Sequence, residues 1–185
     1  MPDQLSHDPR TTPAQVPASR IREAQLADVP AIVTLVRELA EYEKEPDAVE
    51  ATDEHFTAAL FPDDPTAARS HALVAESVDA DGGTHVVGMA VWYVTFSTWT
   101  GRHGIWLEDL FVRPEQRGSG LGTALLARLA GIAVDRGYRR LEWWVLRWNE
   151  PSIAFYDALG ATPMDEWLHY RVDGQPLHAL AARDR

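Results

Sequence analysis

The chain has 185 residues, of which 45% are hydrophobic, so it is long enough to bury a sizeable core within one domain. It contains no cysteine, which excludes disulfides, thiolate metal sites and a cysteine nucleophile. Its net charge of −11 argues against a nucleic-acid partner and is compatible with a cationic small-molecule substrate.

The N-terminal segment, residues 1–18, is polar and rich in proline, with too few apolar side chains to offset the entropy of ordering. We expect residues 1–18 to form a flexible extension and residues 19–185 to form one domain. This N-terminus lacks the pattern of a signal peptide, and no apolar run in the chain approaches the ~20 residues that span a bilayer. We therefore expect a cytoplasmic protein without a membrane partner.

The first predicted elements are a short strand and two helices. Residues 21–24 are typical of a strand, and Asp28 is placed to cap a helix over Val29–Lys44, whose apolar residues form one stripe. Thr52 is placed to cap a second helix that runs through Leu60 and ends before a proline.

Three strands follow. The pattern predicts strands over His71–Glu76, Val86–Phe96 and Ile105–Val112, with a turn at Asp79–Gly83 and a loop at Ser97–Gly104. Because a tight turn joins the first two of these strands, they should pair antiparallel.

The next segment predicts a crossover connection. A helix from Gly120 to Gly137 is followed by a strand over Arg139–Leu146, which should be parallel to the strand before the helix. Pro151 suits the first turn of a last helix over Ser152–Leu159. Strands and helices thus interleave into an α/β (α+β) fold, with a central mixed sheet and helices on both faces.

The most informative motif lies where the third strand runs into the crossover helix. Because the first N–H groups of a helix attract anions, this glycine-rich junction beside Arg117 indicates a phosphate-bearing cofactor. A dinucleotide fingerprint fails, since Thr123 stands where the third glycine belongs, and a P-loop fails because Lys44 is the only lysine. Glycines alone also serve turns that bind nothing. The pattern that remains is Arg117-x-x-Gly120-x-Gly122.

This pattern resembles the R/Q-x-x-G-x-G/A cradle of the GNAT N-acetyltransferases. Three further segments are similar, in order and spacing, to the diamine (spermidine/spermine and thialysine) branch of that family: Arg37–Glu43, Leu107–Val112 and Trp148–Ala161. The resemblance covers residues 20–181. It implies the GNAT fold, acetyl-CoA as cofactor, direct acetyl transfer to a primary amine of a small cationic acceptor, and a homodimer whose C-terminal region contributes to the contact.

The resemblance also implies which residues bind the cofactor. Backbone groups of one strand are expected to contact it, at Leu110, Phe111 and Val112. Asn149 is expected on the pantetheine arm, and Tyr156 close to the sulfur. The pyrophosphate is expected at Arg117, Gly118, Ser119, Gly120, Leu121, Gly122 and Thr123.

Acetylation of an amine requires a base, because an alkylammonium with a pKa near 10 is only about one part in a thousand neutral at pH 7. The resemblance implies that Glu108 helps to bind and deprotonate the amine, and that Tyr156 protonates the leaving sulfur. Side chains alternate along a strand, so Glu108 and Asp109 share one pocket only if a bulge intervenes, as GNAT enzymes have in this strand. Without the resemblance, a solvated carboxylate pair and a core tyrosine would explain these residues equally well.

The acceptor is expected to contact an aromatic and acidic lining formed by Tyr42, Glu43 and Trp99, together with Glu108 and Asp109. Alternatively, Tyr42 covers the apolar side of its helix and Trp99 anchors its loop, and neither contacts an acceptor. The seven histidines show no i, i+4 pair, so no metal is expected. A GNAT enzyme that modifies a protein or an antibiotic-like amine, and a non-catalytic CoA-binding module, remain the alternative functions.

Overall fold

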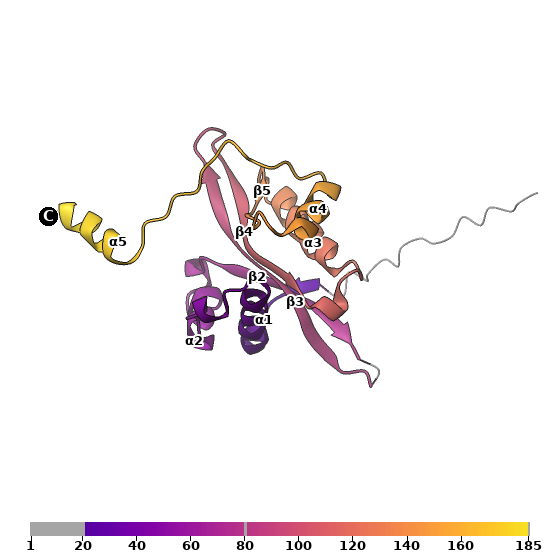
Figure 1. Cartoon of the computed structure of the whole chain (residues 1–185). Helices are drawn as coiled ribbons and strands as arrows, with labels where there is room; N and C mark the ends of the chain where they lie inside the picture. The colour runs from indigo at the N-terminus through magenta and orange to yellow at the C-terminus, as the bar shows by residue number, and fades with distance from the viewer. Residues whose placement is uncertain (1–20, 80, 185) are drawn as a thin grey trace, which may run out of the picture. The chain divides into compact units, whose positions relative to one another are not determined.

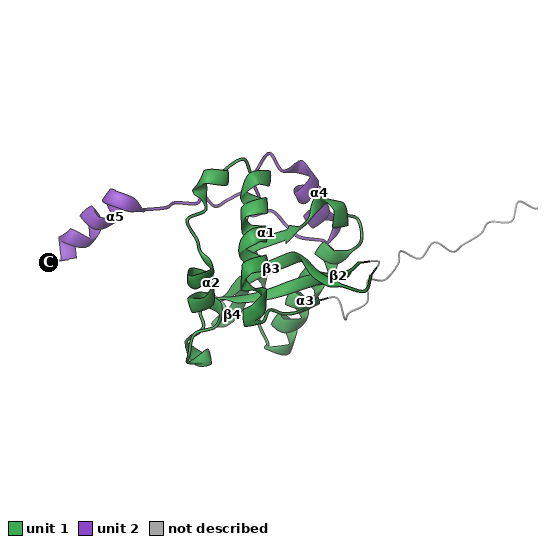
Figure 2. Ribbon diagram, turned by 90° about the horizontal axis from the view of Figure 1, so that it is seen from below, with its two compact units in different colours: residues 1–144 green, residues 145–185 purple. Residues whose placement is uncertain are grey.

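The structure is a computed structural model that describes residues 21–79 and 81–184 (Figure 1). The predicted extension, residues 1–18, lies outside the described residues. The chain divides into two compact units, residues 1–144 and residues 145–185, which are coloured separately in Figure 2. Each unit is described by itself.

Unit 1 contains a five-stranded sheet in the order β1-β2-β3-β4-β5. Strands β1 to β4 pair antiparallel with one another, and β5 is parallel to β4, so the predicted mixed sheet is confirmed. The elements of unit 1 are β1 Ile21–Glu23, η2 Leu26–Asp28, α1 Val29–Tyr42, η3 Pro46–Ala48, α2 Asp53–Leu60, η4 Pro65–Ala67, β2 His71–Val78, β3 Thr84–Ser97, β4 Arg102–Val112, η5 Pro114–Gln116, α3 Leu121–Asp135 and β5 Leu141–Glu142.

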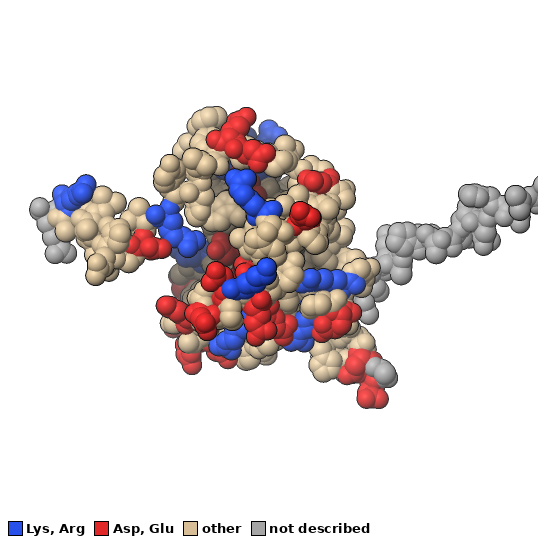
Figure 3. Space-filling model, in the orientation of Figure 1, with Lys and Arg blue, Asp and Glu red and all other residues tan. Residues whose placement is uncertain are grey.

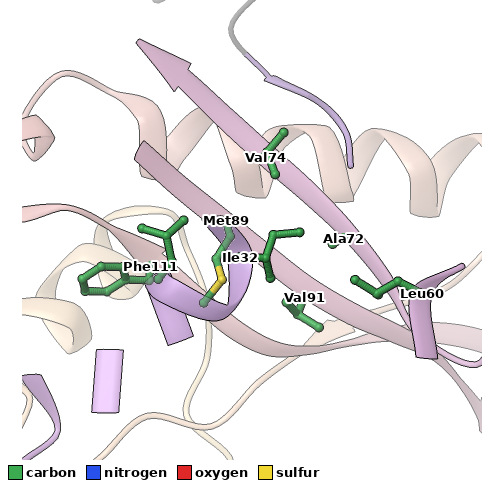
Figure 4. Packing of buried hydrophobic residues seen from close by; sticks show 8 residues of the cluster. Ile32, Leu60, Ala72, Val74, Met89, Val91 and Phe111 are labelled. Carbon is green, nitrogen blue, oxygen red and sulfur yellow. The ribbon is translucent and has the colours of Figure 1, made fainter. Parts of the chain in front are cut away.

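Helices cover both faces of this sheet, as predicted (Figure 1). Helices α1 and α2 pack on one face over a buried apolar cluster, most of whose members are labelled in Figure 4: Ile32, Leu35, Leu60, Ala72, Val74, Met89, Val91 and Phe111. Helix α3 covers the other face and buries its own apolar stripe: Leu121, Leu125, Leu129 and Ile132. Burial of these side chains supplies the main driving force for the fold, because apolar area is removed from water on both sides of the sheet.

The start of α1 differs from the prediction. Asp28 makes no cap hydrogen bond to this helix. Its carboxylate instead accepts from the Arg22 guanidinium at 2.6 Å and from the Gln25 N–H at 2.7 Å. This ion pair holds the pKa of Asp28 below its usual range. The helix also ends at Tyr42 rather than Lys44, because Lys44 has a positive φ of 67°.

Two strand boundaries also differ. The loop predicted over Ser97–Gly104 is shorter, because β4 begins at Arg102 and pairs with the end of β3. The strand predicted over Arg139–Leu146 contains only Leu141 and Glu142, which pair with the first half of β4. Beyond that half, β4 is distorted by a bulge, and the parallel pairing stops there.

Unit 2 contains α4 Glu150–Ala158, α5 Gly174–Ala181 and η6 Ala182–Asp184 (Figure 2). Helix α4 begins two residues earlier than predicted, and Pro151 lies in its first turn as expected. Over residues 21–79 and 81–184, no helix has the length and apolar character needed to cross a bilayer.

Candidate active site

The distortion of β4 is a β-bulge centred on Glu108. Trp92 of β3 pairs with Leu107, whereas Val91 pairs with Asp109, so Glu108 is an extra residue without a partner on β3. A bulge re-aims side chains, and here it lets two consecutive carboxylates lie on the same face of the sheet. The bulge expected in this strand is therefore present.

The Glu108 carboxylate is held by an indole. The Nε1 atom of Trp106, two residues earlier on β4, donates to Oε2 of Glu108 at 3.1 Å. Glu108 is otherwise exposed. The arrangement fixes the side chain while leaving it accessible to a ligand from solvent.

Asp109 is more enclosed than Glu108 and lies in a negative environment. Burial, followed by the charges of Glu108 and Glu43, raises the pKa of Asp109 to about 6. Burial also raises the pKa of Glu43, which follows the last residue of α1. We call Glu43, Glu108 and Asp109 the carboxylate cluster. Three acidic groups within electrostatic range of one another attract a cation, which would relieve their mutual repulsion.

Past the bulge, one edge of β4 has no β5 partner, because among the described residues β5 pairs only with Ile105 and Trp106. The Arg113 N–H donates to Val87 of β3 at 3.0 Å. Since consecutive N–H groups of a strand point to opposite edges, those of Leu110 and Val112 face this open edge. The Val112 carbonyl also faces it, because it accepts from Arg117 Nε at 3.0 Å.

The glycine-rich loop that follows is built for an anion. Gly118 and Gly120 have φ values of 74° and 86°, and Gly120 is the N-cap of α3. Ala124 donates the first hydrogen bond of the helix, to Gly120 O at 2.9 Å. The main-chain amides from Gly118 to Thr123 thus precede the hydrogen-bonded ladder at the positive end of the helix dipole. These features fit a pyrophosphate, and we call this segment the cofactor loop, residues 117–123.

Arg117 connects the cofactor loop to α1. Its guanidinium carbon lies 4.8 Å from the ring centre of Tyr42 and 5.7 Å from that of Phe111. A guanidinium between two rings is favoured by cation–π attraction. Tyr42, predicted to contact the acceptor, is therefore brought to the cofactor loop as well as to the end of α1 that leads into Glu43.

Other predicted site residues lie elsewhere. Trp99 is 87% exposed in the β3–β4 turn, which is about 20 Å along β4 from Glu108 at the usual rise per residue. Asn149 and Tyr156 belong to unit 2. Asn149 caps α4 by accepting from the Ser152 N–H at 3.3 Å, and the Tyr156 ring lies 5.3 Å from that of Phe155. The roles of Trp99, Asn149 and Tyr156 stay predictions.

Sequence reasoning missed two features of unit 1. The first is the contact of Trp106 with Glu108. Residues two positions apart on a strand point to the same face, so this spacing could have indicated the contact. The second is an ion pair between Glu38 of α1 and Arg113, with three N–O hydrogen-bond distances of 2.7, 2.9 and 3.1 Å. No local signal marks this pair, because its members are 75 residues apart.

A pocket of about 340 Å³ lies away from the carboxylate cluster, between the β1–β2 side of the sheet and the residues after α2. Its wall is mostly apolar, with His71, Trp92 and Arg136 among the lining residues.

Within the described part of the chain, no group of His, Asp and Glu side chains is arranged to hold a metal ion. On the face shown in Figure 3, acidic and basic side chains are interleaved.

The fold and the cofactor loop define an acetyltransferase of the GNAT type. Residues 33–161 match the acetyltransferase (GNAT) family, and the chain belongs to this family. It is 38% identical to the thialysine N-epsilon-acetyltransferase of Mus musculus, over 90% of this chain and 99% of that protein. It is 33% identical to the spermidine/spermine N(1)-acetyltransferase-like protein 1 of Homo sapiens, over 88% of this chain and 24% of that protein.

The fold agrees with solved structures. An integron cassette protein from the mobile metagenome of V. cholerae superposes with a TM-score of 0.68 at 26% identity, covering 87% of this chain and 96% of that one. The family match and the two relatives named above confirm the resemblance to the diamine acetyltransferase branch of GNAT enzymes.

Proposed function

We propose that this acetyltransferase uses acetyl-CoA to acetylate a primary amine of a small acceptor that carries more than one positive charge, such as a diamine, a polyamine or thialysine. The observation that carries the proposal is the carboxylate cluster at the β4 bulge. Two of its three members, Glu108 and Asp109, lie on the strand that leads toward the cofactor loop. The relatives named for thialysine and for spermidine/spermine support the same class of acceptor.

Acetyl-CoA supplies an acetyl group activated as a thioester. The main-chain amides of the cofactor loop would hold its pyrophosphate, with the Arg117 guanidinium adding positive charge. The N–H groups of Leu110 and Val112, on the open edge of β4, would bind along its arm. Asn149 of unit 2 is proposed as a further contact to that arm.

The carboxylate cluster would bind the ammonium groups of the acceptor. Glu43 and Asp109 are partly enclosed, so their charges are screened by water less than those of exposed residues. Tyr42, next to Glu43, carries the Arg117 guanidinium over its ring and so joins the acceptor side of the site to the cofactor loop. An acceptor with two charges gains more from such a site than one with a single charge, so the cluster would select against monoamines.

Two groups are proposed for proton transfer. Glu108 accepts the proton of the attacking ammonium, directly or through a water molecule, because it is accessible and its orientation is fixed by Trp106. Tyr156 donates a proton to the leaving sulfur, since a phenol with a pKa near 10 is a competent acid toward a thiolate.

We also propose a homodimer and a cytoplasmic location, where acetyl-CoA is available. Unit 2 supports the dimer, because several of its large apolar side chains are more than half exposed: Met164, Trp167, Leu168, Tyr170, Val172 and Leu180. Exposed apolar groups of this number commonly mark a contact with another chain. Light scattering of the intact protein would test the dimer, and a monomer at micromolar concentration would contradict it.

One experiment tests the acceptor class. Purified protein is incubated with acetyl-CoA and an equimolar mixture of diamines, polyamines, thialysine, monoamines, an aminoglycoside and a lysine-containing peptide, and the products are identified by mass spectrometry. We expect mono-acetylated products of the multiply charged small amines. Preferential acetylation of the peptide or the aminoglycoside would contradict the proposal, as would the absence of any product.

A further inference from the structure

The segment between β4 and the cofactor loop is tied to α1 at two points. Glu38 and Arg113 form a bidentate ion pair, with Arg113 Nε and Nη2 both directed at the carboxylate. One turn further along α1, Tyr42 stacks on Arg117. The two arginines flank η5, so both ends of this short segment are attached to the same helix.

The ion pair is placed to resist movement of this segment. Both side chains are about 70% buried, with exposed fractions of 29% for Arg113 and 31% for Glu38. A planar guanidinium held by two carboxylate oxygens permits only a narrow range of orientations. The Arg113 N–H is also bonded to Val87 of β3, so the residue is anchored to the sheet and to α1 together.

Helix α1 also carries part of the proposed acceptor site. It ends at Tyr42, and the next residue, Glu43, lies close enough to Asp109 to raise the pKa of that carboxyl. The Glu38–Arg113 pair therefore joins α1, which leads into Glu43, to the end of the strand that carries Asp109.

We propose that Glu38 is a positioning residue that couples the two halves of the site. Through Arg113 it sets the segment that leads into the cofactor loop, and through α1 it links that loop to the acceptor-binding carboxylates. The proposal rests on the proposed function. We expect this coupling to be favourable, so that CoA strengthens acceptor binding. Because coupling between two binding sites is reciprocal, the acceptor should strengthen CoA binding by the same factor.

The test compares Glu38→Ala with the matched variant Glu41→Ala. Glu41 is an exposed carboxylate on the same helix, so its replacement makes the same change of charge and helix propensity without touching Arg113. Calorimetric titrations measure the Kd of CoA alone, and that of thialysine with and without saturating CoA. Steady-state kinetics then give kcat and the KM for acetyl-CoA.

In Glu38→Ala we expect the Kd for CoA to rise about five- to tenfold, because a partly buried charged hydrogen-bond pair is lost. The KM for acetyl-CoA should rise by a similar factor while kcat changes less than about twofold, as expected when a ground-state binding contribution is removed. The strengthening of thialysine binding by CoA should shrink toward a factor of one, while Glu41→Ala behaves as the unchanged protein does.

Two results would overturn the inference. The first is a Glu38→Ala protein with a lower Tm but an unchanged Kd for CoA, which would make the ion pair purely structural. The second is an unchanged effect of CoA on thialysine binding. If Glu38→Ala does not fold, Glu38→Gln is measured in the same way. Failure of the unchanged protein to bind CoA would refute the proposed function instead, and it is tested first.

Discussion

The carboxylate cluster and the cofactor loop are built by opposite means. The cluster consists of side chains: Glu43 from the end of α1, and Glu108 and Asp109 from a bulge. The cofactor loop presents main-chain amides, oriented by two glycines with positive φ. The proposed acceptor site therefore depends on which charged groups are present, whereas the proposed cofactor site depends on which backbone angles are allowed.

This difference predicts which substitutions each region tolerates. Neutralising a carboxylate should impair the acceptor site with the backbone intact. In the cofactor loop, side chains other than that of Arg117 should be replaceable, and substitutions that change the backbone should matter most.

The largest effect is expected for Glu108→Gln. The isosteric amide keeps the bulge and an acceptor for the Trp106 N–H but cannot take a proton. We expect kcat to fall by about 10²- to 10³-fold with an unchanged Kd for CoA. Glu50→Gln, an exposed residue elsewhere in unit 1, serves as the control. If kcat stays within a few-fold of normal, Glu108 is not the base.

Tyr156→Phe should be next. Loss of the phenolic proton donor is expected to reduce turnover by about 100-fold while CoA binding, measured by calorimetry, stays the same. Such a result would show that the chemical step depends on the Tyr156 hydroxyl and that CoA binding does not. Full turnover in the variant would remove Tyr156 from the mechanism.

Gly120→Ala tests the main-chain character of the cofactor loop. A residue with a Cβ in the left-handed region costs about 1–2 kcal/mol, so we expect the Kd for CoA to rise about tenfold. Gly131→Ala is the matched control on the same helix. Nothing lies within 4 Å of a Cβ built at Gly131, and the change should stabilise the helix interior by about 0.5–1 kcal/mol. Equal CoA binding by both variants would contradict the contrast.

The smallest kinetic effect is expected for Asp109→Asn. Below a pH of about 6 the Asp109 carboxyl is protonated and loses its charge, so kcat/KM for the acceptor should fall as the pH decreases through this value. The variant should raise the acceptor KM about fivefold at pH 7.5, on the order of one lost charge interaction, and should abolish this pH step. A step that persists in the variant belongs to another group.

The same variant makes a prediction for stability with the opposite sign. The pKa of Asp109 is raised in the fold to about 6, so this carboxyl favours folding when protonated and loses that contribution as the pH rises through the folded value. Asp109→Asn should therefore stabilise the protein at pH 7.5 by about 1–2 kcal/mol. The gain in Tm, followed by calorimetry, should disappear as the pH approaches 4.

Much of the fold was predictable because it depends on local patterns. Thr52 caps α2 through a hydrogen bond to the His55 N–H, and Gly137 has the positive φ expected after α3. The cofactor loop was predictable for the same reason, since its glycines report backbone angles directly. The bulge was expected from family resemblance, because alternation alone would have placed Glu108 and Asp109 on opposite faces.

Features that depend on distant partners were not predictable. Asp28 has the residue type of a helix cap, but the Arg22 guanidinium competes successfully for its carboxylate. The parallel pairing of β5 stops at Trp106, just before the bulge in β4, and the sequence of β5 carries no signal of that bulge. Likewise, nothing local indicates that Glu38 pairs with Arg113.

The bulge at Glu108 has a consequence for how such a site can arise. With that residue removed, Leu107 and Asp109 would be consecutive, and every remaining side chain of β4 would keep its face and its partner on β3. The bulged strand therefore differs from a regular hairpin strand by one residue. We expect a deletion variant lacking residue 108 to fold, with Leu107 and Asp109 on opposite faces of a regular strand.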